Sequence, residues 1–178
     1  MYARERMRTI WFLYSKLLEA QEKGNFKEFC HYFDAIIPLA RSVTQALQKE
    51  FKHKEDFKEW YSNIQEIMDK DQLFRFFNNE RNLILKEGRQ SEKEIKYQIT
   101  AFCPSEYEKP KIVLTRTDDK INGRLVEANS YDRDIPGKVI IRYLYYLKNK
   151  PEQQAVVLLH KYLIEIEMIL IDFKKTVL

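Results

Sequence analysis

Apolar residues recur at three- and four-residue spacing through residues 1–90, which is typical of helices that bury one face. The first stripe predicts a helix from about Tyr2 to Glu22, and Gly24 and Asn25 break it. Asn25 is placed to cap a second, long helix. Pro38 lies inside this second helix, so it should bend the helix or leave one carbonyl without its usual donor.

Two shorter helices are predicted before residue 90. Asp56 is placed to cap the first of them, and Asp69 or Asp71 to cap the second. Gly88 should end the second helix in a left-handed conformation. The inner face of the first is expected to consist of Trp60, Ile64, Ile67 and Met68. The inner face of the second is expected to consist of Leu73, Phe74, Phe77, Arg81, Ile84 and Leu85.

The hydrophobic period changes to two after Gly88, which indicates strands. The segment EIKYQITAF predicts one strand, KIVLTRT from Lys111 a second, and Asn122-Gly123 a hairpin turn before RLVEA. Residues 138–148 are ambiguous between strand and helix, and their Val, Ile and Tyr content favours strand. The segment Ser91–Glu94 also fits a capping box, so a short helix is the alternative there.

A last helix is predicted from Pro151, because proline is favoured at the first helical position. Its apolar face is broad and consists of Leu159, Tyr162, Leu163, Ile166, Ile169, Leu170 and Phe173. The whole pattern predicts an α+β fold that is mostly α, in one domain spanning residues 1–178. A helical bundle would comprise residues 1–90 and 151–178, with a small antiparallel β insertion at about 91–148.

Composition and charge narrow the function classes. Hydrophobic residues make up 44% and charged residues 33% of the chain, as in ordinary globular proteins. The net charge of +4 is spread evenly, with 16 Lys and Arg against 14 Asp and Glu in residues 1–90. Phosphate binding needs positive charge gathered on one face, so charge alone favours a mixed, solvated surface over a nucleic-acid partner.

Metal, cofactor and membrane chemistry find no support in the sequence. Cys30 and Cys103 form neither a metal motif nor a disulfide framework, and the glycines are too scattered for a phosphate loop. No apolar run approaches the length of a membrane span, and the first residues read as a charged amphipathic helix. We therefore expect a cytoplasmic protein without a cofactor or metal and without a membrane partner.

The pair Arg81-Asn82 is the anomaly of the chain, because Arg81 falls on the stripe where burial is expected. A buried guanidinium must be paired or hydrogen-bonded. Arg81 should therefore line an interface or cleft, or meet an acid such as Asp34, Glu80 or Glu87.

The segment RNLILKEG resembles the signature of the HEPN superfamily. Members of this superfamily are helical-bundle proteins in which a helix late in the chain carries Arg-Asn, followed a few residues later by a histidine. With ARSVTQALQKEF and FKEWY it is also similar to a group of uncharacterised bacterial proteins. The resemblance implies an up-and-down bundle, a symmetric homodimer and a toxin–antitoxin or defence setting. In the ribonuclease members, Arg and His of two facing motifs act on RNA. Arg81 and Asn82 match the motif, whereas Lys86 stands at the histidine position.

Lys86 disfavours cleavage, because an ammonium is a poor base unless it is strongly desolvated. Arg81, Asn82, Lys86 and Glu87 form the candidate functional motif, with no catalytic residue assigned. The resemblance thus implies a non-catalytic module that acts through dimerisation or by binding a partner protein, RNA or a nucleotide. The alternative is a degenerate ribonuclease in which His31 replaces the missing histidine. A third hypothesis, a small-molecule binder, would use the aromatic residues Tyr97, Phe102, Tyr143 and Tyr145 of the β insertion.

Overall fold

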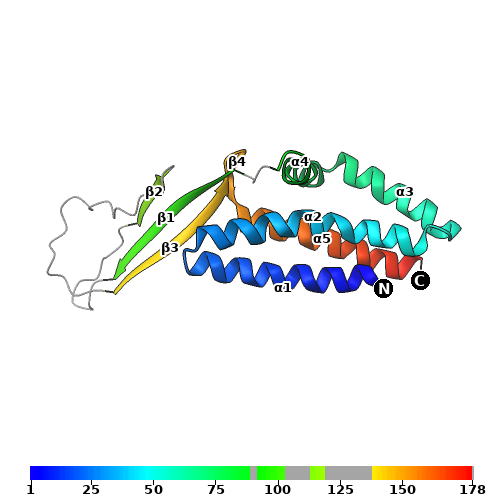
Figure 1. The fold of residues 1–178 in the computed structure, drawn as a ribbon, viewed down its shortest axis with the longest axis horizontal. Coiled ribbons are helices and arrows are strands. Elements are labelled where there is room, and N and C mark those ends of the chain that lie inside the picture. Colours follow the sequence, from blue (N-terminus) through cyan, green and yellow to red (C-terminus); the bar gives the residue numbers. More distant parts are fainter. Residues whose placement is uncertain (89–91, 103–112, 119–137, 178) are drawn as a thin grey trace. The chain divides into compact units, whose positions relative to one another are not determined.

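The computed structural model describes residues 1–88, 92–102, 113–118 and 138–177. The chain divides into two compact units (Figure 1). The helical unit comprises Met1–Glu92 and Ala155–Leu178, and the sheet unit comprises Lys93–Gln154. The fold is α+β and mostly α, as predicted. None of the helices in the described ranges has the length and apolar character that crossing a membrane requires.

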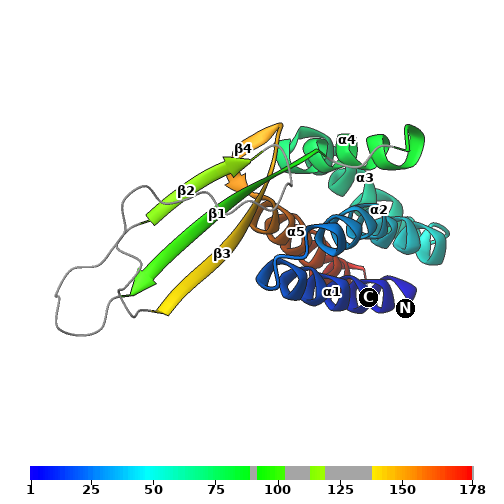
Figure 2. The ribbon, with the colours of Figure 1, turned by 60° about the vertical axis from the view of Figure 1, so that its left-hand side comes forward.

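Five helices form the helical unit: α1 (Tyr2–Glu22), α2 (Phe26–Phe51), α3 (Glu55–Lys70), α4 (Gln72–Lys86) and α5 (Ala155–Thr176). The first two lie side by side as an antiparallel pair (Figures 1 and 2). The last helix contacts all four others. It is apolar on most of its circumference, which suits a helix packed from several sides.

The predicted helix ends are largely confirmed. Gly24 has a φ of 66° and Gly88 a φ of 63°, the left-handed conformation that glycine adopts without strain. The Asn25 side chain accepts a hydrogen bond from the Glu28 amide at 3.2 Å. Asp71 caps α4, because its Oδ1 accepts from the amides of Leu73 and Phe74 at 2.7 and 2.9 Å.

The beginning of α3 differs from the prediction. The prediction that Asp56 caps α3 is wrong, since the helix begins at Glu55 with Lys54 before it and no side-chain cap. Asp56 instead lies in the first turn, where its negative charge interacts favourably with the positive end of the helix dipole.

Pro38 lies inside α2, which continues from Phe26 to Phe51.

Aromatic packing connects α3 to α5. The Phe173 ring lies 5.2 Å from the Trp60 ring and 5.8 Å from the Phe57 ring, centroid to centroid. Trp60 Nε1 donates to Asp172 Oδ2 at 2.6 Å. The indole therefore buries its apolar body and still satisfies its donor, as buried tryptophans usually do.

The predicted inner faces of α3 and α4 were partly wrong. Ile67 is 60% exposed and Leu85 is 62% exposed, whereas Glu80 is only 2% exposed. Phe77, fully buried, stacks on Tyr162 of α5 with ring centroids 4.4 Å apart. Because Phe77 faces α5, Glu80, one helical turn later on the same side of α4, is also buried. Leu85, near the end of the helix, is exposed to solvent.

Four antiparallel strands form the sheet described in the second unit: β1 (Lys93–Phe102), β2 (Val113–Asp118), β3 (Lys138–Leu147) and β4 (Lys150–Gln154). Their order is β2-β1-β3-β4. Ile95 of β1 faces Tyr145 of β3 across the ladder.

The strand predictions are confirmed where the structure describes them. Residues 138–147 are a strand, and the alternative of a short helix at Ser91–Glu94 fails because β1 begins at Lys93. KIVLTRT is a strand from Val113 onward. The predicted turn at Asn122-Gly123 and the RLVEA segment lie outside the described residues.

The prediction that Pro151 begins the last helix is wrong. Pro151 lies in β4, and α5 begins only at Ala155. As the last strand in the sheet order, β4 pairs with β3, and its other side forms no ladder hydrogen bonds with the residues that the structure describes. Proline lacks an amide hydrogen and is tolerated on such an edge.

Candidate functional site

Arg81 lies half-buried on α4, where its neighbour Asn82 provides its hydrogen-bond partner. Arg81 Nη2 donates to Asn82 Oδ1 at 2.8 Å, and Arg81 Nε is buried without a partner among the described residues. The observed partner is thus an amide, whereas a carboxylate was one of the expectations. The Arg81 guanidinium therefore has N–H donors that form no hydrogen bond with the described residues, and it is partly shielded from solvent.

The charges of two arginines, Arg41 and Arg81, influence the pKa of the Tyr162 hydroxyl on α5. Its side chain is buried between Phe77 and the edge of the Phe74 ring, whose centroid lies 5.4 Å away. Burial raises the pKa of Tyr162 to about 12, while the positive charges of Arg41 and Arg81 act in the opposite direction. The charges of Arg41 on α2 and Arg81 on α4 therefore act on one phenol on α5.

A small cavity opens at this junction of α2, α3, α4 and α5, with a volume of about 70 Å³. Its walls are formed by Arg41, Gln65, Met68, Asp69, Phe74, Arg75, Asn78 and Tyr162. Two guanidinium groups and two amides face one carboxylate, so donors predominate. The volume has room for a few water molecules or for one small anion.

Lys86 and Glu87 lie apart from this cavity. Both side chains are exposed at the C-terminal end of α4, and neither lines the cavity. The Glu87 amide donates to the Leu83 carbonyl at 3.2 Å and closes the helix. Arg81 and Asn82 do not line the cavity either. The structure thus brings Arg81 and Asn82 together by a hydrogen bond and leaves Lys86 and Glu87 at the surface.

A known family covers much of the helical unit. The family described as bacteriophage lambda protein ea47 matches residues 19–115, more than half of the 178-residue chain. The chain belongs to the Ea47 family. No curated protein and no solved structure matches it.

The Ea47 match includes Arg41, Arg81 and Asn82 but ends before α5. Tyr162, on which the charges of Arg41 and Arg81 act, therefore comes from a part of the chain beyond the matched residues. The small cavity of this Ea47 protein is built jointly by the matched helices and by α5.

His31 does not lie at the cavity. Its side chain is exposed on α2, while its neighbours Cys30 and Phe33 are buried, and it is not among the cavity-lining residues. His160 is also exposed, and its ring lies 5.6 Å from the Tyr14 ring on another side of α5. Within the described ranges, no group of three or more His, Cys, Asp or Glu side chains could hold a metal ion.

The aromatic residues of the β insertion are only partly described. Tyr145 is fully buried and Tyr143 half-buried on β3. Only the backbone of Tyr97 and Phe102 is described, in β1. The small cavity lined by Tyr162 lies in the helical unit rather than on these aromatics.

Sequence reasoning missed three polar groups of the helical unit. Glu80 was treated only as an acid that could pair with Arg81, although its position three residues after Phe77 places it on the same helix face. Tyr162 was assigned to the core without regard to its hydroxyl, and Arg41 was not considered. A polar residue inside an apolar stripe was the available signal for all three.

Proposed function

We propose that this Ea47 protein is a non-catalytic HEPN-like helical module that acts through dimerisation and through binding a partner protein or nucleic acid. The observation that carries the proposal is the half-buried, hydrogen-bonded pair Arg81-Asn82 on α4, whose arginine charge acts on the phenol of Tyr162. The helical architecture and the HEPN-like string RNLILKEG support it. We further propose that the protein acts in the cytoplasm, in a toxin–antitoxin or defence system.

The absence of cleavage follows from the groups near Arg81. Attack by a 2′-hydroxyl on the adjacent phosphodiester needs a proton acceptor at the hydroxyl and a donor at the leaving oxygen. Tyr162 stays protonated at neutral pH, because burial raises its pKa to about 12. Lys86 and His31 are exposed and do not line the cavity. Arg81 can hold a phosphate in this arrangement but cannot take a proton.

Dimerisation is proposed through the C-terminal half of α4. Leu85 is 62% exposed, and Leu83 and Ile84 are half-buried next to Arg81 and Asn82. A two-fold axis at this face would bury Leu85 against its symmetry mate and bring the two Arg81-Asn82 pairs near each other. An apolar centre flanked by polar groups is typical of protein interfaces.

One observation favours ribonuclease activity as the alternative. Asp69 is the single carboxylate among the residues that line the small cavity, and Arg41 and Arg75 line it as well. A carboxylate beside two guanidinium groups could accept the 2′-hydroxyl proton while the arginines hold the phosphate.

A labelled single-stranded RNA separates the two functions. The wild-type protein, Arg81→Ala and Asp69→Asn are each incubated with it, in magnesium and in chelator, and binding is followed by anisotropy. We expect intact RNA throughout. RNA binding weakened in Arg81→Ala would support a nucleic-acid partner, and RNA binding unchanged in this variant would leave a protein partner. Cleavage by wild type that disappears in Arg81→Ala and Asp69→Asn would replace the proposal with the ribonuclease.

A further inference from the structure

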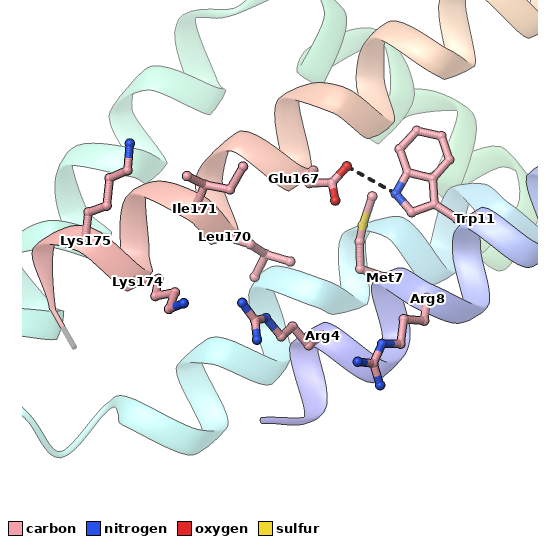
Figure 3. A pocket seen from close by; sticks show the side chains of 9 residues that line it. All are labelled: Arg4, Met7, Arg8, Trp11, Glu167, Leu170, Ile171, Lys174 and Lys175. Carbon is pink, nitrogen blue, oxygen red and sulfur yellow. Dashed lines mark hydrogen bonds between the residues drawn. The ribbon is translucent and has the colours of Figure 1, made fainter.

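A groove of about 520 Å³ runs between the beginning of α1 and the end of α5, two segments that lie side by side (Figures 1 and 3). We call it the basic groove. Its floor is apolar and consists of Met7, Leu170 and Ile171. The first two are buried, and Ile171 is 42% exposed.

Four cations surround this floor: Arg4, Arg8, Lys174 and Lys175. Arg8 pairs with Glu5 at 2.7 Å, whereas the other three have no carboxylate partner among the described residues. Figure 3 shows the Arg4 and Lys174 side chains extending toward one another across the gap between the helices. Like charges arranged in this way attract an anion between them.

The one carboxylate in the groove is already engaged. Glu167 Oε2 accepts a hydrogen bond from Trp11 Nε1 at 3.2 Å (Figure 3). The Trp11 ring in turn packs edge-on against Tyr14 and His160, with centroids 5.6 and 5.7 Å away. Glu167 therefore positions the indole, and its single negative charge leaves an excess of positive charge among the four cations that line the groove.

An exposed apolar stripe on α5 leads into the basic groove. Val157, Ile164, Met168 and Ile171 are exposed large hydrophobic residues. With Lys161 and Lys175 they follow an alternating spacing of three and four, the spacing at which one helix packs along another. Ile171 belongs to both features, so the stripe and the groove form one continuous surface.

We infer that this surface docks an acidic amphipathic helix of a different protein. Apolar side chains of the partner helix would cover Ile164, Met168 and Ile171, and its carboxylates would approach Arg4 and Lys174. A helix laid along a groove with spaced apolar anchors is an established way to bind a peptide. This surface shares no residue with the small cavity around Tyr162, so it does not depend on the proposed function.

A second copy of this chain fits the surface poorly. A two-fold interface places the same patch of both molecules face to face. The positively charged patch formed by Arg4, Lys174 and Lys175 would then face the same patch of the second molecule. Like charges brought together at an interface oppose association.

Nucleic acid also fits less well than a helix. Single strands bind by stacking bases on exposed aromatic faces. Trp11 is the aromatic residue of the groove, and Tyr14 and His160 already pack against it. The sugar-phosphate backbone has no apolar side to cover Ile171 and Met168.

The test uses a fluorescent peptide of about 20 residues of Leu, Glu and Ala, with leucines at three- and four-residue spacing. A scrambled peptide of the same composition lacks the apolar stripe and serves as the peptide control. Binding to the full-length protein is followed by anisotropy at low and high salt. We expect the patterned peptide to bind, the scrambled one to bind at least about tenfold more weakly, and high salt to weaken both.

Two variants test the surface itself. The double variant Arg4→Glu with Lys174→Glu should weaken peptide binding about tenfold, and Ile171→Asp should do the same by removing the apolar contact. Lys27→Glu with Lys49→Glu on α2 is the matched control, because both lysines are exposed and neither lines the groove. Circular dichroism establishes that each variant is folded.

Three results would overturn the inference. The first is equal binding of the patterned and scrambled peptides, or binding of neither. The second is peptide binding that the groove variants do not weaken relative to the α2 control. The third is stronger binding to single-stranded RNA or to anionic phospholipid vesicles that the groove variants abolish, since the surface would then serve a polyanion or a membrane.

Discussion

The rings of Phe77 and Tyr162 stack with centroids 4.4 Å apart and an angle of 17° between their planes. This contact joins α4 to α5, although the two residues lie far apart in the chain. It keeps Glu80 inside, and it holds the Tyr162 hydroxyl where Arg41 and Arg81 act on it. The packing of α4 and the geometry of the candidate site therefore depend on the same pair.

Phe77→Ala should destabilise the helical unit by about 3–5 kcal/mol, because it removes a fully buried ring and leaves a cavity. Urea unfolding monitored by circular dichroism measures the change. Phe12→Ala is the matched control, since Phe12 is 60% exposed and its loss should cost less than about 0.5 kcal/mol. Equal effects of the two substitutions would contradict the role of the stack.

Arg81→Ala should lower the free energy of unfolding by about 1–3 kcal/mol, because it removes the donor to Asn82 Oδ1 from a half-buried site. Lys86→Ala on the same helix provides the comparison, as that side chain is exposed. Thermal and urea unfolding of both variants measure the difference. A melting curve of Arg81→Ala that coincides with wild type would mean that Arg81 is dispensable for the fold.

Stability should fall at alkaline pH partly because of Tyr162. Folding raises the pKa of its phenol from 10.0 to about 12, so the unfolded chain loses this proton first. The contribution is fully present below pH 10 and is lost as pH rises toward 12, to a total of about 3 kcal/mol. Tyr162→Phe keeps the ring stack and should show a smaller fall in the free energy of unfolding between about pH 10 and about pH 12. Identical pH profiles would show that Tyr162 does not contribute.

Leu85→Glu should convert the proposed homodimer to a monomer of 21.6 kDa, because it places a carboxylate at the centre of the expected interface. Multi-angle light scattering at tens of micromolar measures the mass. Ile67→Glu on α3 is the control, since Ile67 is similarly exposed but lies on another helix. A monomeric wild-type protein would rule out the dimer while leaving the basic groove untouched.

Local chemistry made several features predictable. The Asn25 and Asp71 caps and the left-handed Gly88 involve contacts between residues two or three apart, so the sequence contains all the participants. The strand at 138–147 followed from its β-branched and aromatic content. The Arg81-Asn82 pair was found for the same reason, as a polar interruption of an apolar stripe.

The sequence by itself determined the number and order of the helices, most of their ends and the change to strands after Gly88. The tertiary structure decided that Pro151 joins an edge strand, that α4 turns Glu80 inward and Leu85 outward, and that Arg41 and Tyr162 line one cavity. Helix caps and periodicity arise from neighbouring residues, whereas helix rotation and strand pairing minimise the free energy of contacts between distant segments.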